Sequence, residues 1–245
     1  MRPLLLNWRG IRIHAYPAFL FIGLTAGIIV GFRWGRGNGL DPVHLYVALI
    51  TLVIPALVGS RLLYVACHWQ HYRMHPGEIW ARQQGGAALY GGLLLALACS
   101  WPLLRLLQVP FGAFWDVAAI TILVGMIATK IGCLLNGCCA GHESSGWLAL
   151  RLPNRDGVWR RRVPSQLLEC GIASLLLIAA LSWKSRPFAG ALFLSAMTGY
   201  ATARLWLETT REQTERVAGV GVYTAISAVL IFCGLGSFGV WWIRS

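Results

Sequence analysis

The sequence predicts an all-α, polytopic integral membrane protein of about seven transmembrane helices packed in one bundle. Three observations support this prediction: 57% of the 245 residues are hydrophobic, only 12% are charged, and the apolar residues fall in long runs. Soluble domains carry about 25% charged residues, so this chain lacks the polar surface that water requires. The length suits one compact bundle, and we expect residues 1–245 to form a single transmembrane domain.

Seven apolar runs are long enough for a helix to cross a hydrocarbon core of about 30 Å, which takes about 20 residues. The first run follows a basic stretch without a small-residue cleavage site, so we expect it to be retained as a helix. Tryptophans lie near the predicted ends, Trp115 among them, as in an interfacial aromatic belt. The longest polar joint covers 137–164. The predicted spans are 17–32, 43–67, 85–107, 115–135, 165–183, 188–207 and 219–242.

The chain is strongly basic, with 21 Lys and Arg residues against 9 Asp and Glu and a formal net charge of +12. The cations lie between or inside apolar runs, so the charge favours anionic lipid as the partner and argues against nucleic acid. Seven spans place the two termini on opposite sides of the membrane. The N-terminal side carries more arginines, and the positive-inside rule therefore predicts a cytoplasmic N-terminus.

Several ionisable side chains lie within or at the ends of predicted spans, although such a group costs at least about 2.5–3.5 kcal/mol at the centre of a membrane helix. Arg204 and Glu208 are four residues apart on one helix face, where they can pair. For the single charges near span ends, snorkelling to the interface is the alternative interpretation. As a set, cations beside glycine-rich turns predict a pocket for a phosphate head group. The ionisable residues at these positions are the cations Arg61, Lys130, Arg204 and Arg211 and the carboxylates Glu169 and Glu208.

A glycine-rich stretch over 85–92 opens the third predicted span. Glycine pairs allow the backbone to approach another helix or a ligand closely, and both interpretations stay open. Tyr90 lies among these small residues, where its phenol could touch a bound lipid.

The segment 130–142 is the densest cluster of polar and thiol side chains. Its cysteines and histidine could be metal ligands, but their spacing is not a standard zinc pattern and no second CxxC exists. We therefore expect no metal and no cofactor, and interpret the cysteines as small residues at a tight helix end. A thiol near Lys130 would have a lowered pKa and could react. The residues are Cys133, Cys138, Cys139 and His142.

These stretches, taken in order over about 11–236, resemble the prolipoprotein diacylglyceryl transferase family. Tyr16 stands in a segment similar to the family's entry to its first helix. The segment 59–65 resembles G-G/A-R-L-x-Y-V, and 85–92 resembles G-G-x-x-F-H-G-G. The segment 130–141 resembles the signature R-x-G-N-F-x-N-x-E-x-x-G. Further similarity lies at 164–169, which resembles H-P-S-Q-L-Y-E, and at 199–211, which resembles Y-G-x-x-R-F-x-x-E-x-x-R.

The departures from the family pattern indicate a divergent branch. Tyr90 stands where the family has a His, and Lys130 replaces the signature Arg, which keeps the charge without the bidentate fork. Cys133 and Cys138 replace the signature Asn and Glu. The residues that keep their places are Asn136, Gly137 and Gly141.

The resemblance implies a multi-pass enzyme of the bacterial plasma (inner) membrane. It would transfer a diacylglyceryl group from phosphatidylglycerol to the thiol of a lipobox cysteine in a prolipoprotein. Lys130 and Arg204 would hold the phosphate, with Arg61 and Arg211 in support. Tyr90, at the position of the family His, would be the third catalytic residue beside Lys130 and Arg204. A tyrosine has a pKa of about 10 and is a poor base, so Tyr90 could instead donate a hydrogen bond and leave the thiol to be activated by the cations alone. The other expected contacts are Tyr16 and Asn136 to the head group, Glu208 to Arg204, Gln166 and Glu169 as a buttress, and Gly137 and Gly141 in the signature turn.

The family places its N-terminus and active site outside, in conflict with the arginine count, and we follow the family. Three alternatives stay open. One is a related membrane transferase that uses the same lipid with a different acceptor, and another is a non-enzymatic lipid-binding or lipid-translocating protein. The third is a metal or redox protein built on Cys133, Cys138, Cys139 and His142.

Overall fold

The structure is a computed structural model that describes residues 4–8, 11–79, 88–154, 157–211, 216–217 and 220–244. Eight long helices and three two-stranded hairpins account for most of these residues. The long helices are α1 (Ala15–Gly37), α2 (Pro42–Thr51), α3 (Val53–Cys67), α5 (Leu89–Leu106), α6 (Phe111–Asn136), α7 (Ser165–Ser182), α8 (Ala191–Glu208) and α9 (Val222–Arg244). The shorter elements are α4 (Trp69–Tyr72), η1 (Pro76–Glu78), β1 (Leu4–Trp8), β2 (Ile11–His14), β3 (Leu150–Pro153), β4 (Trp159–Arg162), β5 (Arg216–Val217) and β6 (Val220–Gly221).

The helices confirm an all-α, polytopic membrane fold. Among the described residues, six helical segments are long and apolar enough to cross a membrane, with α2 and α3 counted as one segment over 42–67. The sixth predicted span coincides with α8, whose apolar character is diluted by Arg204 and Glu208. Helices are required here because the hydrocarbon core offers no water to the backbone, so each segment must satisfy its own N–H and C=O groups.

Three details differ from the sequence-based expectation. The second predicted span is interrupted at Leu52, between α2 and α3. Pro55 explains the interruption, because a proline ring clashes with the carbonyl four residues earlier and has no N–H to donate. The polar joint 137–164 contains the antiparallel hairpin β3–β4, which the apolar pattern did not indicate. Trp115 is buried in the core and does not face the interface.

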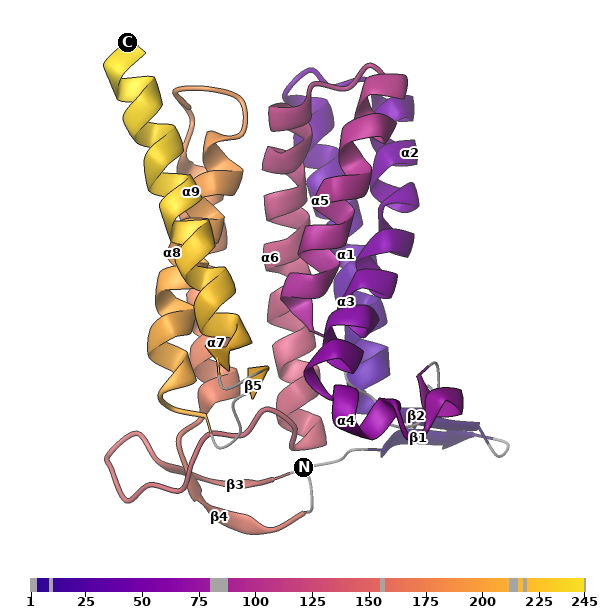
Figure 1. Ribbon diagram of the computed structural model, residues 1–245, viewed down its shortest axis with the longest axis vertical. Coiled ribbons are helices and arrows are strands. Elements are labelled where there is room, and N and C mark those ends of the chain that lie inside the picture. Colours follow the sequence, from indigo (N-terminus) through magenta and orange to yellow (C-terminus); the bar gives the residue numbers. More distant parts are fainter. Residues whose placement is uncertain are drawn as a thin grey trace.

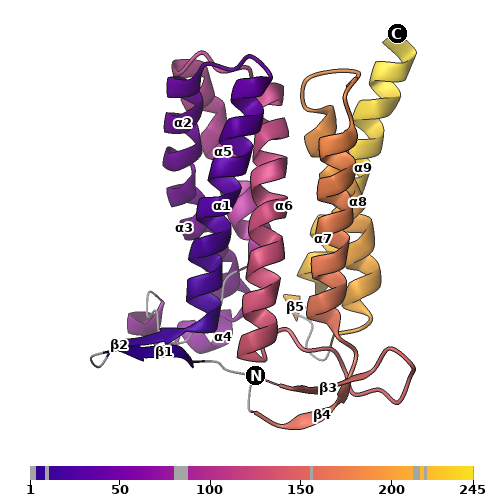
Figure 2. The ribbon, with the colours of Figure 1, turned by 180° about the vertical axis from the view of Figure 1, so that it is seen from behind.

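The helices run side by side along the long axis of the molecule (Figure 1). Helix α6 packs against α1 on one side and against α7 and α8 on the other, so it joins two groups of helices (Figure 2). The hairpins β1–β2 and β3–β4 lie at the end of the bundle that holds the N-terminus. The C-terminus lies at the opposite end, as an odd number of crossings requires.

Glycines bring two helix pairs into close contact. In α1, the buried Gly23, Gly27, Gly31 and Gly35 recur every four residues, and a Cβ on Gly27 would collide with the carbonyl of Thr121 in α6. Gly59 of α3 and Gly91 of α5 face each other, and a Cβ on either would collide with the other's carbonyl. The packing interpretation of the glycine-rich stretch is confirmed for Gly91, whereas 85–87 lie outside the described residues.

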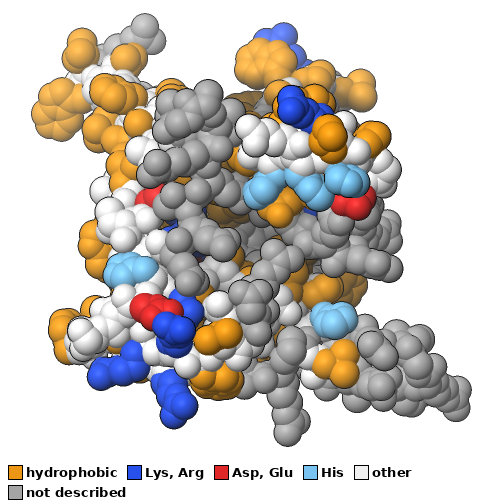
Figure 3. Space-filling view, turned by 60° about the horizontal axis from the view of Figure 1, so that its bottom comes forward, with side chains coloured by type: hydrophobic (Ala, Val, Ile, Leu, Met, Phe, Trp, Pro, Cys, Tyr) orange, Lys and Arg blue, Asp and Glu red, His pale blue; other side chains and the backbone are white. Residues whose placement is uncertain are grey.

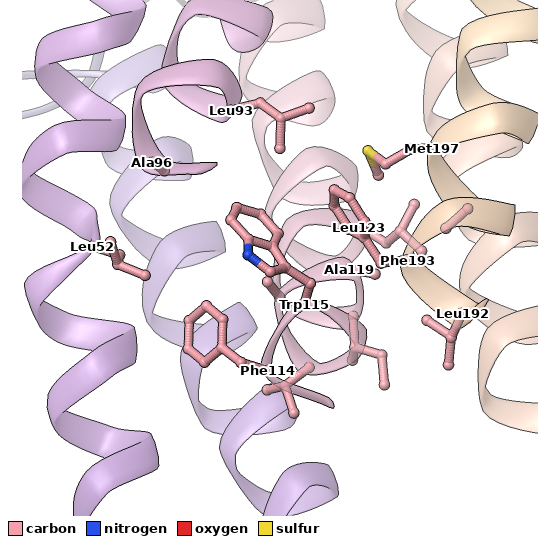
Figure 4. Close-up of a cluster of buried hydrophobic side chains, with 14 of the residues drawn as sticks. Leu52, Leu93, Ala96, Phe114, Trp115, Ala119, Leu123, Leu192, Phe193 and Met197 are labelled. Carbon is pink, nitrogen blue, oxygen red and sulfur yellow. The ribbon is translucent and has the colours of Figure 1, made fainter. Parts of the chain in front are cut away.

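The hydrophobic core lies where α5, α6 and α8 meet (Figure 4). Trp115 of α6 sits at its centre, with its ring centroid 4.8 Å from that of Phe193 in α8. Its indole N–H donates to the hydroxyl of Ser100 in α5 at 3.1 Å, which satisfies the only polar group of a buried tryptophan. This core fixes the relative positions of the helices that carry the charged residues described below.

Asp116 of α6 fastens the first turn of α8 and provides a stability prediction. Its buried carboxylate accepts hydrogen bonds from the backbone N–H groups of Gly190 at 2.9 Å and Phe193 at 3.0 Å. In Asp116→Ala these donors lose their partner, at about 1–3 kcal/mol each. We expect the free energy of unfolding to fall by about 2–4 kcal/mol, measured by thermal unfolding in detergent. Asp41→Ala removes an exposed cap of α2 and should cost about 1 kcal/mol. Equal effects of the two substitutions would contradict this role.

Candidate active site

A buried carboxylate with three cations around it lies near the end of the bundle that carries the N-terminus. Glu169, in the second turn of α7, is fully buried. Arg204 of α8 donates to its Oε1 at 2.9 Å, and Arg211, just after α8, pairs with the same oxygen. Lys130 of α6 pairs with Oε2. Lys130 and Arg204, which the sequence predicted to converge, therefore contact one and the same side chain.

The position of Arg204 is fixed by its own helix and by a neighbouring one. Glu208, one turn later in α8, pairs with its Nη2 at 2.9 Å, as the spacing of four residues predicted. The guanidinium also stacks on the ring of Tyr223 in α9, with Cζ 4.6 Å from the ring centroid. Its side chain is only 4% exposed. A guanidinium with this many partners is held rigidly before any ligand arrives.

The charges of this cluster do not cancel. Lys130, Arg204 and Arg211 carry three positive charges, whereas Glu169 and Glu208 carry two negative ones. Removing a charge from water is expensive, so an excess of buried charge calls for a counter-ion. Because the excess is positive and includes two planar guanidinium groups, the cluster suits a phosphate or another oxyanion.

The signature turn after α6 lies against the start of α7. Asn136 is the last residue of α6, and Gly137 (φ +73°) ends the helix in the left-handed conformation that glycine favours. Gly141 forms an isolated β-bridge with Arg211, and a Cβ on Gly141 would collide with the carbonyl of Val163. These two glycines thus bring the turn up to the charged cluster.

Gln166 presents a buried amide beside this turn. Its Nε2 donates to the carbonyl of Cys138 at 2.8 Å. Its Oε1 is buried and finds no hydrogen-bond partner among the described residues. A buried acceptor without a partner costs about 1–3 kcal/mol, which a hydroxyl or N–H of a bound ligand would recover.

Tyr16 approaches the site from α1. Its backbone lies against Gly132 of α6, where an added Cβ would stand 3.4 Å from the Tyr16 Cα. Its phenol is close enough to Lys130 and to the thiol of Cys133 to interact with them electrostatically. The structure therefore brings Tyr16 to the same end of α6 as the signature residues.

Tyr90 lies in an aromatic layer next to the cluster. Its buried ring is 5.6 Å from that of Tyr223 and 6.4 Å from that of Tyr200, centroid to centroid. Its hydroxyl shares a hydrogen bond of 2.7 Å with Ser227. Tyr90 thereby links α5 to α9, and Tyr223 contacts both Tyr90 and Arg204.

Arg61 is anchored near the surface hairpins. Its Nε donates to the carbonyl of Ile79 at 2.7 Å, and its Nη2 donates to the carbonyl of Glu78 at 3.1 Å. The guanidinium also lies over the rings of Tyr64 and Tyr72. These contacts hold Arg61 on the α3 side of the bundle, whereas the Glu169 cluster joins α6, α7 and α8.

Three thiols meet beside the cluster. The Sγ atoms of Cys133, Cys138 and Cys139 all lie within 4.8 Å of one another. His142, the fourth candidate ligand in the sequence, instead contacts the carbonyl of Thr210 through Nδ1 at 3.0 Å. The pKa of the Cys139 thiol lies well below its usual value, because it interacts with the other two thiols and because Lys130 and Arg211 are close. Gly137 forms the tight helix end, at which Cys133 is buried, whereas Cys139 is an exposed residue.

Sequence reasoning missed one buried cation. Arg162, the last residue of β4, is 1% exposed and contacts the carbonyl of Gly141 at 3.5 Å and the carboxylate of Glu143 at 3.4 Å. It stands in a run of three arginines, which resembles ordinary interfacial charge. Strand alternation puts Arg160 and Arg162 on the same face, where both pair with Glu143, so it would not by itself have distinguished the buried Arg162 from the exposed Arg160.

An apolar pocket of about 210 Å³ lies between the loop 144–149 and the helices α7 and α8, where Leu168, Trp206 and Thr210 line it. The charged side chains around Glu169 do not line this pocket. Figure 3 shows this end of the molecule, where basic and histidine side chains lie among hydrophobic ones. Such a surface matches the boundary between lipid head groups and acyl chains.

Fold and site together define a polytopic membrane protein with a buried cluster of cationic and carboxylate side chains near the end of the bundle that holds the N-terminus. The family model of the prolipoprotein diacylglyceryl transferases matches residues 3–242. The chain belongs to this family.

Relatives from several bacteria are similar over almost the whole chain. The phosphatidylglycerol–prolipoprotein diacylglyceryl transferase of Bordetella avium is 31% identical over 86% of this chain and 79% of its own length. The enzymes of the same name from Bacillus velezensis and Lactiplantibacillus plantarum are 29% and 27% identical, over 94% and 96% of this chain and 85% and 88% of their own lengths.

Proposed function

We propose that this protein transfers the diacylglyceryl group of phosphatidylglycerol to a cysteine thiol of a prolipoprotein, and that it does so in the bacterial plasma membrane. The observation that carries the proposal is the buried, net positive cluster of Lys130, Arg204 and Arg211 around Glu169. The proposed substrates are those in the names of the relatives, phosphatidylglycerol and a prolipoprotein. The net positive cluster supports the binding of an anionic head group. We also propose that the acceptor cysteine belongs to a lipobox.

The reaction breaks the bond between the glyceryl carbon and the phosphate oxygen. A thioether bond forms from sulfur to that carbon, the electron pair of the broken bond leaves with glycerol phosphate, and the thiol loses its proton. Negative charge on the leaving phosphate is stabilised by Lys130 and Arg204 in a site shielded from water. Arg211 supports them, and Glu208 keeps Arg204 in place.

The remaining residues hold the head group and shape the pocket. Tyr16, Asn136 and Gln166 offer hydrogen bonds to the glycerol hydroxyls, and the free Oε1 of Gln166 is suited to accept one. Gly137 and Gly141 bring the signature turn to the cations. Arg61 is proposed to contribute positive potential from the α3 side.

Tyr90 is proposed to position the site by linking α5 to α9, because its hydroxyl is already bonded to Ser227. Tyr90→Phe should then lower kcat/KM for transfer by less than about tenfold, since one hydrogen bond is worth about 1 kcal/mol. Ser227→Ala removes the same hydrogen bond from the other side and should have the same effect. Both rates are measured with labelled lipid over a range of pH. A loss of about 10²–10⁴ in Tyr90→Phe alone would instead identify Tyr90 as the general base.

Orientation gives a further prediction. The site lies at the end of the helix bundle that holds the N-terminus. An exported prolipoprotein presents its cysteine on the outer face of the membrane. A tag at the N-terminus should therefore be labelled by a membrane-impermeant reagent in intact cells, and a tag at the C-terminus only after lysis. The reverse labelling pattern would support the cytoplasmic N-terminus that the arginine count predicts, and would place the site at the cytoplasmic leaflet.

A reconstituted assay tests the function itself. The purified protein is incubated with labelled phosphatidylglycerol and a lipobox peptide, and the products are identified by mass spectrometry. A diacylglyceryl thioether on the peptide cysteine supports the proposal, and a peptide with serine in place of that cysteine should stay unmodified. Lipid that is bound but never converted would favour a lipid-binding protein, and glycerol phosphate released without peptide modification would indicate a different acceptor.

A further inference from the structure

The fold gathers three cysteine sulfurs at the end of α6 that the proposed lipid chemistry does not use. Cys133 is buried in the last turn of the helix, and Cys138 and Cys139 follow the left-handed Gly137, which turns the chain back toward it. The three Sγ atoms lie within 4.8 Å of one another. A zinc ion with Zn–S bonds of about 2.3 Å needs sulfurs about 3.8–4.0 Å apart. Movements of less than about 1 Å would therefore complete the site.

The backbone of Cys139 also points to a use for its side chain. Its φ is +59°, a region that costs a residue other than glycine about 1–2 kcal/mol. A glycine would adopt this conformation without strain. The thiol is thus kept at a position where the backbone disfavours it, which is characteristic of functional sites.

The number of sulfurs favours a metal over a disulfide. Cys133, Cys138 and Cys139 form no disulfide in this structure, and a disulfide among them would use two of the three thiols and leave the third without a role. Three convergent thiolates match soft, thiophilic ions such as Zn²⁺. Lys130 and Arg211 lie close enough to Cys139 to interact with it electrostatically, so a zinc-thiolate centre would share these two cations with the proposed phosphate.

We propose that Cys133, Cys138 and Cys139 bind one Zn²⁺ ion and leave its fourth coordination position open to an external thiol. Three protein ligands with one open position is the arrangement of catalytic zinc sites. Cys139 is an exposed residue, so its side of the thiol cluster is the one that a peptide would approach. His142, held by Thr210, does not belong to the ligand set.

The open coordination position would activate the acceptor thiol, a role that Tyr90 does not fill. This part of the inference rests on the proposed function. A thiol that coordinates zinc is deprotonated, and its proton passes to water. The bound thiolate then provides the electron pair for the new S–C bond, while the electrons of the C–O bond leave with glycerol phosphate. Zinc is neither oxidised nor reduced in this step.

The test uses the purified full-length protein in detergent. We expect one zinc per chain by elemental analysis, and the cobalt-loaded protein should show the thiolate-to-metal absorption band and the visible spectrum of tetrahedral Co²⁺. A lipobox peptide should change the cobalt spectrum, and its Cys-to-Ser version should not. Zinc-free wild type that binds neither ion, or an intact-mass spectrum with a disulfide among the three cysteines, would overturn the site.

The variant Cys139→Gly separates ligand loss from misfolding. It removes one thiol and relieves the backbone strain, so its melting temperature should be unchanged or higher, while zinc binding weakens by more than about 100-fold. Cys99→Ser and Cys233→Ser, which alter exposed cysteines outside the cluster, should bind zinc as the wild type does. Wild-type affinity in Cys139→Gly would refute the ligand set. Zinc binding without any lipid transfer would refute only the proposed function, and full transfer by zinc-free protein would refute only the role of the metal.

Discussion

Glu169→Gln is expected to abolish lipid transfer and to destabilise the protein, because Glu169 is the anion that three cations share. Without it, Lys130, Arg204 and Arg211 repel one another inside the bundle. Removing one partner of a buried ion pair costs about 3–5 kcal/mol. We expect a decrease of this size in the free energy of unfolding, and a fall in transfer below about 1% of the wild-type rate. Thermal unfolding in detergent and the reconstituted transfer assay measure the two effects.

Two matched variants separate catalysis from stability. Glu169→Asp keeps the charge but shortens the side chain, so stability should largely return while transfer stays impaired. Asp116→Asn alters another buried carboxylate, which lies in α6 and accepts a hydrogen bond from the backbone at the start of α8. It should lower stability, but at a temperature where the variant is folded it should not affect transfer. Wild-type transfer in Glu169→Gln would contradict the arrangement proposed for the site.

The second large effect is expected at Lys130. Lys130→Met removes a positive charge from a site where its side chain is only 14% exposed, with little change in side-chain volume. Loss of one such electrostatic contact to a developing charge typically costs about 10²–10³ in rate, and we expect kcat/KM for transfer to fall by that factor. The rate is measured with labelled phosphatidylglycerol and a lipobox peptide.

Lys130→Arg is the control, because the family signature that this segment resembles has arginine there. It keeps the charge and adds a bidentate donor, so it should retain transfer or raise it. Arg105→Ala removes an exposed arginine at the far end of α5 and should be silent. If Lys130→Met were as active as Lys130→Arg, the lysine would not touch the phosphate.

The helices could be predicted because a chain segment in the hydrocarbon core must satisfy its own backbone hydrogen bonds, and a helix does so. Runs of about 20 apolar residues must form helices there, and the observed α1, α6 and α7 lie within a few residues of the predicted spans. The break at Leu52 could also have been anticipated from Pro55. The hairpin β3–β4 could not, since it lies outside the apolar core, where the hydropathy pattern carries no information.

The site was only partly predictable. The pair Arg204–Glu208 follows from its spacing on one helix, because i and i+4 are always neighbours. The central role of Glu169 does not, since it depends on how α6, α7 and α8 pack around it. Sequence reasoning therefore assigned it only a buttressing role. Likewise, the convergence of three thiols depends on the left-handed turn at Gly137, which brings Cys138 and Cys139 back to the helix end.

Binding of phosphatidylglycerol, measured apart from catalysis, tests the central claim most directly. The wild type and Lys130→Met are compared by native mass spectrometry for their affinity toward phosphatidylglycerol and toward a diacylglycerol with the same acyl chains. If the cluster around Glu169 holds the phosphate, the wild type should prefer the anionic lipid at least tenfold, a difference of about 1.4 kcal/mol, and Lys130→Met should lose most of that preference. An equal preference in both proteins would show that the head group binds elsewhere.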